Sequence, residues 1–600
     1  MTIDMGFNAL KTAYASGELT PEQVMADIRE RAKNYSDYNI WLHLLSEAEQ
    51  APWLAALADK DPASHPLWGI PFAIKDNIDL AGIATTAGCE AFAYTPEASA
   101  HVVQQLLDAG AIPVGKTALD QFATGLNGTR STIGPCHNAF NPDYISGGSS
   151  SGSAVALALG LCSFSLGTDT AGSGRVPACF NNLIGLKPSR GLLSATGLVP
   201  ACRSLDCISI FAFNTDDANC ALAVAEGFDP QDAFSRQNPF NNQARHYGVR
   251  SGVLTIGVIP QGQLQFFGDE AYQQAYTDTL TTLKDAGMHL VDIDYAPFAE
   301  AAKLLYEGPW VAERYLATQP LIDDNPQAIF PVVREIIAPG GQPRATDLFR
   351  AEYRLIGLKR ACQAQIAKVD CLLTPTAGRL FTIDEMIAEP IKRNSELGYY
   401  TNFMNLADLA SIAVPTQFTP AGLPFGITLV GQAFSDRALL SIGNRIQTLF
   451  PLNKGTLPFP AVPENATPTG NADTIDVLVC GAHLEGLPLN WQLTERGATL
   501  KTQTHTAPHY RMFALAGGPP FRPGLILDKT EGAAIEAEVW SVPSKEFGSF
   551  VAGIPAPLGI GKVELENGER VCGFICEGYA VEGAQEITHL GGWRGYVATL

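Results

Sequence analysis

The stretch from residue 145 to residue 191 constrains the fold more than any other part of the chain. It reads ISGGSSSGSAVALALGLCSFSLGTDTAGSGRVPACFNNLIGLKPSRG, with small-residue turns at 147–152 and 168–174. An apolar run at 154–159 lies between them and predicts a helix. Glycine permits unusual backbone angles and close approach of another group, and successive backbone N–H groups in such turns can hold an anion. We therefore predict two tight turns set into a core rather than a flexible Ser/Gly linker.

Two known kinds of site that use such turns, the P-loop and the nucleophile elbow, fit this sequence poorly. A P-loop needs Lys and then Ser or Thr after its last glycine, whereas Ser153 and an alanine follow Gly152. A nucleophile elbow needs Gly-x-Ser-x-Gly, which residues 148–152 match around Ser150. A loop this rich in Ser and Gly meets that pattern easily, and no histidine occurs between His137 and His246. The elbow is therefore a weak interpretation.

Serine catalysis with a lysine base fits better. The segment GIPFAIKDN at 69–77 places Lys75 at the end of an apolar run that predicts a strand. Burial there lowers the pKa of the amine and frees it to act as a base. Lys116 also ends an apolar run and is a rival for the same role.

Taken together, GIPFAIKDN, the GGSSSGS loop and the GTDTAGSGRVPACF turn resemble the amidase signature family over roughly the first three quarters of the chain. The resemblance implies a triad in which Lys75 is the general base, Ser149, preceded by a cis peptide bond, is the bridging serine, and Ser173 is the nucleophile. A serine hydroxyl attacks well only when a neighbour takes its proton, and a lysine can do so only when it is neutral. The resemblance also implies an oxyanion hole made by the backbone N–H groups of Thr170, Ala171, Gly172 and Ser173.

The segment LLYEGPWVAERY at 304–315 bears on specificity. Tyr306 and Arg314 are eight residues apart, which is about two helical turns, so both can face one side of a helix. An arginine there can hold a carboxylate by a two-pronged hydrogen bond, while a solvated arginine is the alternative. The sequence of this segment resembles that of allophanate hydrolases within the amidase signature family, and the resemblance implies that Tyr306 and Arg314 bind the substrate carboxylate. We expect Gly125, in the loop at 121–130, to let the backbone approach the substrate.

The order of predicted elements indicates two domains. Strand-like runs alternate with helices over 67–135 and again from 254, which favours an α/β fold; the resemblance implies a mixed central sheet covered by helices. Residues 451–473 are rich in Pro, Asn, Thr and Gly, as linkers are. We expect an amidase signature domain at 1–455, a linker at 456–473, and a smaller, mostly β domain at 474–600.

The predicted second domain resembles the C-terminal domain of full-length allophanate hydrolases, similar in fold to γ-glutamylcyclotransferases. That resemblance implies decarboxylation of the first domain's product, with His483 matching the functional histidine. A structural or dimerising role is the alternative, and a lone histidine after a strand is often a hydrogen-bonded structural residue. Tyr510, Arg511 and Arg522 are candidate anion ligands.

Composition excludes several classes of function. A net charge of −21 disfavours a nucleic-acid partner or an anionic membrane surface. The start of the chain lacks a signal-peptide pattern, and no apolar run reaches transmembrane length. The twelve cysteines lack zinc-site spacing, so we expect reduced thiols in a cytoplasmic protein with no metal and no organic cofactor.

The resemblance implies that allophanate is hydrolysed to ammonia and N-carboxycarbamate, and that decarboxylation then leads to ammonia and CO₂. It also implies a homodimer, with urea carboxylase as a functional partner. Four rivals remain: an amidase of another small carboxylated amide, a broad-specificity amide hydrolase, a tRNA amidotransferase subunit, and a non-catalytic binding protein. Tyr306 and Arg314 argue against a broad-specificity amidase. The net charge and the additional β domain argue weakly against the amidotransferase subunit.

Overall fold

The computed structural model describes residues 2–248, 253–463 and 474–600. The chain divides into two compact units. The first comprises Met1–Asn238 and Tyr247–Ala466, and the second comprises Pro239–His246 and Thr467–Leu600. Each unit is described separately below.

The first unit is built on one mixed sheet of eleven strands, in the order β1-β3-β2-β4-β6-β5-β10-β11-β9-β7-β8. Three neighbouring strands, β3, β2 and β4, run parallel, whereas β4–β6, β5–β6, β5–β10 and β10–β11 are antiparallel. The fold class is therefore the predicted α/β one with a mixed central sheet. The strands are β1 (Trp41–Leu44), β2 (Pro71–Lys75), β3 (Ile112–Thr117), β4 (Phe164–Asp169), β5 (Ile184–Lys187), β6 (Cys207–Ala212), β7 (Thr255–Val258), β8 (His289–Asp292), β9 (Cys371–Pro375), β10 (Leu409–Phe418) and β11 (Pro424–Gln432).

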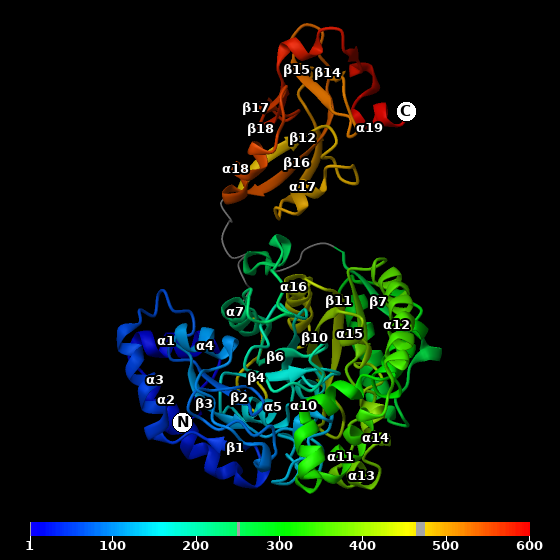
Figure 1. Cartoon of the computed structure of the whole chain (residues 1–600). Coiled ribbons are helices and arrows are strands. Elements are labelled where there is room, and N and C mark those ends of the chain that lie inside the picture. The colour runs from blue at the N-terminus through cyan, green and yellow to red at the C-terminus, as the bar shows by residue number, and fades with distance from the viewer. Residues whose placement is uncertain (1, 249–252, 464–473) are drawn as a thin grey trace. The chain divides into compact units, whose positions relative to one another are not determined.

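Helices surround this sheet. The amino-terminal helices α1–α4 gather at one end of the first unit and α11–α14 at the other (Figure 1). They are α1 (Phe7–Ser16), α2 (Pro21–Ala32), α3 (Glu47–Ala56), α4 (His101–Asp108), α5 (Ser151–Ala158), α6 (Val176–Phe180), α7 (Thr215–Ala225), α8 (Glu270–Asp285), α9 (Ala296–Glu307), α10 (Val311–Asp324), α11 (Pro331–Ile337), α12 (Ala345–Ile366), α13 (Ile383–Ala388), α14 (Lys392–Leu397), α15 (Phe403–Leu406) and α16 (Asp436–Gln447).

The most deeply buried elements lead to the two small-residue turns. Every residue of β2, β3 and β4 is buried, as is every residue of α5, which begins directly after the first turn. The second turn follows β4. Because β2 and β4 pair in parallel, with Ile74 opposite Leu166, the carboxyl ends of both strands meet at the same edge of the sheet. Lys75 and the second turn are therefore neighbours.

The second unit is mostly β. A five-stranded sheet has the order β13-β16-β12-β18-β17, and a three-stranded sheet has the order β15-β14-β19. Its own apolar core includes Val477, Met512, Val539 and Trp593. The elements are β12 (Thr474–Val479), α17 (Trp491–Thr494), β13 (Thr499–His505), β14 (Tyr510–Ala514), β15 (Pro523–Leu527), β16 (Glu536–Pro543), α18 (Ser544–Ala552), β17 (Leu558–Glu564), β18 (Arg570–Cys576), β19 (Gln585–Glu586) and α19 (Trp593–Val597).

The predicted linker lies only partly within the described residues. Positions 464–473 fall outside them. Leu457 packs in the core of the first unit, and Phe459 packs against that core. The first unit therefore continues past residue 455, because apolar side chains anchor this Pro- and Gly-rich segment. In the described part of the chain, no helix is both long and apolar enough to cross a bilayer.

Candidate active site

Lys75 is the central titratable group of the candidate site. It is the last residue of β2 and is completely buried. Its Nζ donates hydrogen bonds to Ser149 Oγ at 2.7 Å and to Thr168 Oγ1 at 2.6 Å. Burial lowers the pKa of the amine to about 7, against the opposing attraction of Asp120 and nearby carboxylates. A substantial neutral fraction therefore exists at neutral pH, and a neutral amine can accept a proton.

The first turn presents Ser149 to this amine. The peptide bond between Gly148 and Ser149 is cis, and the serine is completely buried. A side chain cannot replace the hydrogen of Gly148, because a Cβ there would lie 2.3 Å from Asp120 Oδ2. The turn is therefore packed tightly against the loop that follows β3. Asp120 organises that loop by accepting hydrogen bonds from the backbone N–H groups of Asn127, Gly128 and Arg130.

The second turn carries Ser173, which is 2% exposed. Among the described residues, its hydroxyl makes one hydrogen bond, a long one of 3.4 Å to the carbonyl oxygen of Gly125. Among the described contacts, no hydrogen bond joins Ser173 to Ser149. The loop at 121–130 therefore reaches Ser173 through Gly125, the residue expected to approach the substrate.

Asp169 and Arg175 brace the second turn. Both side chains are completely buried, and Arg175 donates to both oxygens of Asp169, at 2.8 and 2.9 Å. The same carboxylate accepts the backbone N–H groups of Gly172 at 2.9 Å and Gly174 at 3.0 Å. One of the four predicted oxyanion donors, the N–H of Gly172, is thus already engaged by the protein.

A second buried carboxylate supports the turn from the other side. Asp206 Oδ1 accepts from Thr170 Oγ1 at 2.5 Å, and Asp206 also accepts the backbone N–H groups of Ala201 and Cys202. Burial raises the pKa of Asp206 to about 6. Ala171 lies in the same apolar cluster as Leu305 and Trp310. The junction between α9 and α10 therefore packs against the turn.

Tyr306 and Arg314 lie close together, but they belong to two different helices. The structure ends α9 at Glu307 and begins α10 at Val311, which corrects the expectation of one continuous helix. Gly308 and Pro309 cause the break, since proline has no N–H and clashes with the preceding helical turn. The Cζ atom of Arg314 lies 5.9 Å from the centre of the Tyr306 ring.

Arg314 is fixed from the loop at 121–130. It is 3% exposed and donates to the carbonyl oxygen of Ala123 at 3.2 Å and to Thr124 Oγ1 at 3.0 Å. Both bonds are made by one nitrogen, Nη1. The structure therefore brings the expected residues Gly125, Tyr306 and Arg314 to the same side of the Ser173 turn.

The rival lysine, Lys116, is held elsewhere. Its amine lies 3.1 Å from Asp76 Oδ1 and donates to Thr85 Oγ1 at 2.9 Å. Both members of this ion pair are buried. Lys116 is thus occupied by a structural ion pair and, among the described contacts, makes no hydrogen bond with Ser149 or Ser173.

Thr168, Asp120 and Asp206 were not identified as site residues from sequence. Thr168 lies 93 residues from Lys75, and Asp206 lies 36 residues from Thr170. One sequence signal exists for Thr168, which is the first residue of the small-residue turn at 168–174. Within the described residues, no cluster of three or more His, Cys, Asp or Glu side chains could hold a metal ion.

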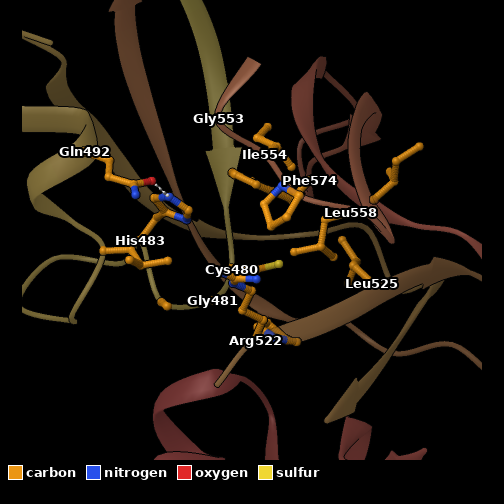
Figure 2. A pocket seen from close by; sticks show the side chains of 15 residues that line it. Cys480, Gly481, His483, Gln492, Arg522, Leu525, Gly553, Ile554, Leu558 and Phe574 are labelled. Carbon is orange, nitrogen blue, oxygen red and sulfur yellow. Dashed lines mark hydrogen bonds between the residues drawn. The ribbon is translucent and has the colours of Figure 1, made fainter. Parts of the chain in front are cut away.

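In the second unit, His483 faces a small cavity. Its Nε2 lies 2.9 Å from Gln492 Oε1, and its ring stacks on Phe574 at 4.9 Å between ring centres (Figure 2). Because Oε1 is only an acceptor, Nε2 carries the proton of this bond. Burial lowers the pKa of His483, so the imidazole is mainly neutral at neutral pH.

The three candidate anion ligands of the second unit differ in their surroundings. Tyr510 is buried, and its oxygen accepts the backbone N–H of Glu564 at 2.9 Å. Arg511 is surrounded by the carboxylates of Glu586, Asp528 and Glu531. Arg522 is the candidate that lines the cavity with His483.

Comparison with known proteins gives consistent matches along the chain. The Amidase family model matches residues 24–440, and the model for the allophanate hydrolase C-terminal domain matches residues 475–598. The urea amidolyases of Lachancea kluyveri and Saccharomyces cerevisiae are 42% and 44% identical over 100% and 94% of this chain. The chain spans only 33% and 31% of the length of those two relatives. The solved structure of SeMet-substituted Kluyveromyces lactis allophanate hydrolase is 40% identical, covers 99% of each chain and superposes with a TM-score of 0.76.

Proposed function

The chain belongs to the amidase family, and from this premise we propose that it is an allophanate hydrolase. The observation that carries the proposal is the buried Lys75 amine, hydrogen-bonded to Ser149 at 2.7 Å and adjacent to the turn of Ser173. Sequence similarity also supports the proposed function, since this chain is 40% identical to the Kluyveromyces lactis allophanate hydrolase over 99% of both chains.

In the proposed first step, neutral Lys75 takes a proton through Ser149 from the hydroxyl of Ser173. The Ser173 oxygen then bonds to the terminal amide carbon of allophanate, and the carbonyl electron pair moves onto oxygen. The C–N bond breaks as the nitrogen receives the relayed proton, so that ammonia leaves and an acyl-enzyme forms. Water, deprotonated by the same relay, releases N-carboxycarbamate and restores Ser173.

The developing oxyanion would be held by backbone N–H groups of the second turn. We propose Thr170, Ala171 and Ser173 as its donors, because the N–H of Gly172 is engaged by Asp169 at 2.9 Å. Donors fixed before the reaction need no reorganisation in the transition state, which is the main advantage of such a site. The bond between Thr170 and Asp206 helps to fix this turn.

Arg314 and Tyr306 would hold the substrate carboxylate. Nη1 of Arg314 bonds to Ala123 and Thr124, and the guanidinium also contacts the Cys202 thiol. With five N–H groups in all, it can still offer donors to a carboxylate. Burial strengthens that bond because little water competes with it. A carboxylate held there orients the opposite end of a short substrate toward Ser173.

In the second unit, we propose that His483 promotes loss of CO₂ from N-carboxycarbamate. A C–N bond breaks, its electron pair stays on nitrogen, and the nitrogen takes up one proton to give carbamate. Carbamate then decomposes to ammonia and CO₂. A structural or dimerising role for this unit remains the alternative.

Ammonia release from allophanate tests the first-step assignment. We expect the full chain to prefer allophanate to malonamate and to reject acetamide, since acetamide lacks the carboxylate. The Ser173→Ala variant should lose ammonia release by at least about a thousandfold while keeping its melting temperature. Near-full activity of S173A would refute the assignment. Preference for malonamate would favour an amidase of another small carboxylated amide.

We also retain four wider proposals. The second domain comprises 474–600, and the first domain extends beyond the predicted end at residue 455, because Leu457 and Phe459 pack with its core. The protein acts in the cytoplasm, for which the twelve free cysteines provide support. It forms a homodimer, and its substrate is supplied by a urea carboxylase, which the similarity to longer urea amidolyases supports.

A further inference from the structure

The cavity beside His483 has a volume of about 50 Å³. Its walls come from the segment after β12, the start of β15, the segment between α18 and β17, and β18. Most of the wall is apolar, including Leu525, Ile554, Leu558 and Phe574. Figure 2 shows His483 and Gln492 on one side of the space, with Arg522 and Leu558 at other parts of its wall. A cavity of this size accepts a ligand of only a few heavy atoms.

The lining of this cavity carries positive charge, whereas the chain as a whole is negatively charged. The whole chain carries a net charge of −21, yet no aspartate or glutamate lines the cavity. The one arginine or lysine in the lining is Arg522, and the other titratable groups are His483 and Cys480. Burial raises the pKa of the Cys480 thiol to about 12, so this cysteine adds no negative charge. The cavity therefore favours an anion.

Arg522 is also the arginine within 474–600 whose guanidinium has no hydrogen-bonding partner in the described part of the chain. The other four are engaged. Arg511, Arg570 and Arg594 pair with carboxylates, and Arg496 donates to Ser549 Oγ and to the carbonyl oxygen of Gln492. This half-buried guanidinium therefore has donors free to bind an anion that enters the cavity.

Access to the guanidinium is also favourable. Arg522 and Leu558 line a neighbouring hollow of about 290 Å³, formed with residues of the segment at 515–520. That hollow likewise contains no acidic residue. A small anion entering from this side would meet Arg522 before it reached His483.

We propose that Arg522 is the anion-binding residue of this cavity, and that the anion is a small dicarboxylate with one carboxylate on the guanidinium. The proposal rests on the proposed function, which makes N-carboxycarbamate the occupant. Gln492 holds the ring of His483 through Nε2, which leaves Nδ1 for the bound molecule. Arg522 thus recognises the charge, while His483 lies beside the bond that breaks.

Binding of malonate tests this proposal directly. Malonate has two carboxylates joined through one atom, as N-carboxycarbamate has, and it is stable. Titration calorimetry would use the full chain carrying Arg314→Gln, so that the carboxylate site of the first unit does not contribute. Adding Arg522→Gln should weaken malonate binding about tenfold or more, because a charge-assisted two-pronged bond is lost. Arg522→Lys should give an intermediate affinity.

Arg570→Gln is the matched control, because Arg570 is an exposed arginine of the same unit and pairs with Glu564. It should leave malonate binding within twofold. If R522Q and R570Q bound malonate equally well, the proposal would be overturned. Melting temperatures of the variants identify any loss of folding.

A product assay keeps the test independent of the Arg314 background. In the full chain with Arg314 intact, R522Q should release ammonia from allophanate at an initial rate of about half the normal one, because the second ammonia forms only after decarboxylation, while CO₂ release lags behind it. Simultaneous release of ammonia and CO₂ in R522Q would refute the role of Arg522. Failure of the unaltered protein to release ammonia from allophanate would instead refute the proposed function.

Discussion

At the scale of single residues, the pKa of Lys75 is a balance between burial and carboxylates. Burial lowers this pKa most, while Asp120, Asp206 and Asp169 raise it and Arg314 lowers it. Without the carboxylates, the pKa of the amine would be lower, and the amine would be neutral but a weaker base. With less burial, its pKa would be higher, and it would stay protonated at neutral pH. The observed balance places the pKa near 7, where both protonation states are populated.

This balance predicts the pH dependence of the first reaction. Lys75 must be neutral to accept a proton, so kcat/KM for allophanate should rise with pH through about 7 and reach a plateau above it. Below the pKa, the rate constant should fall about tenfold per pH unit, as for a single essential base. Initial rates of ammonia release from pH 5 to 9 measure this profile. A rate constant that did not change between pH 5.5 and 8 would contradict the role of Lys75.

Lys75, Ser149 and Ser173 could be proposed as a triad from sequence because each lies in a short local pattern. Thr168 could not, because its contact with Lys75 joins strands β2 and β4 and depends on their register. The same is true of the bonds between Asp120 and the loop at 127–130, which pair polar groups whose positions only the packed fold determines. The local sequence shows which residue types are present in a motif, whereas the distances between motifs are set by the packed fold.

Thr168 offers a second prediction. Thr168→Val keeps the shape of the side chain and removes the oxygen that accepts from Lys75 at 2.6 Å. We expect kcat to fall about tenfold, because the amine loses one of its two orienting partners. The acid limb of the pH profile should also move to lower pH, since the lost acceptor favoured the charged amine.

Thr117→Val is the matched control for this change. Thr117 is buried and bonds to Ser153 Oγ at 2.7 Å rather than to Lys75. It should leave the pH profile unchanged. A T168V variant with the same kcat and pH profile as T117V would show that Thr168 has only a structural role.

At the scale of elements, the junction between α9 and α10 decides how Tyr306 and Arg314 meet. Spacing alone suggested one helix because eight residues make about two turns. The break at Gly308 and Pro309 replaces that geometry with two helices whose apolar residues pack against the second turn. Tyr306 and Arg314 are close together even though they do not share one helix, because packing, rather than helical periodicity, brings the two side chains together.

A substitution at Gly308 should therefore affect substrate recognition more than the proton relay. A Cβ at this position would lie 2.4 Å from the carbonyl oxygen of Leu304 and 3.1 Å from the Trp310 ring. In Gly308→Ala the junction must shift, so KM for allophanate should rise about tenfold. The acid limb of the pH profile should stay in place. An unchanged KM would show that the junction does not position the carboxylate site.

The control for this change is Gly357→Ala in α12. Nothing lies within 4 Å of a Cβ built at Gly357. Alanine in a helix interior is favoured over glycine by about 0.5–1 kcal/mol. G357A should therefore keep the same KM and melt at an equal or higher temperature.

At the scale of the whole molecule, the two units have separate apolar cores. The core of the first draws on residues from Met5 to Leu457, and the core of the second draws on residues from Val477 to Trp593. The division was predictable because composition changes sharply over 451–473. The exact end of the first unit was not, since Leu457 is anchored by contacts that composition does not reveal.

Separate cores predict that the first reaction survives removal of the second unit. A chain ending at residue 463 retains every described contact of Lys75, Ser149, Ser173 and Arg314. We expect it to melt cooperatively and to release ammonia from allophanate with kcat within about twofold of the full chain, because none of these contacts involves the second unit. Release of CO₂ should lag behind ammonia, since N-carboxycarbamate then decays without His483. The full chain carrying His483→Ala should show the same lag with both units present. If the truncated chain folded but released no ammonia, the second unit would have to contribute to the first reaction, and the assignment of one reaction to each unit would be wrong.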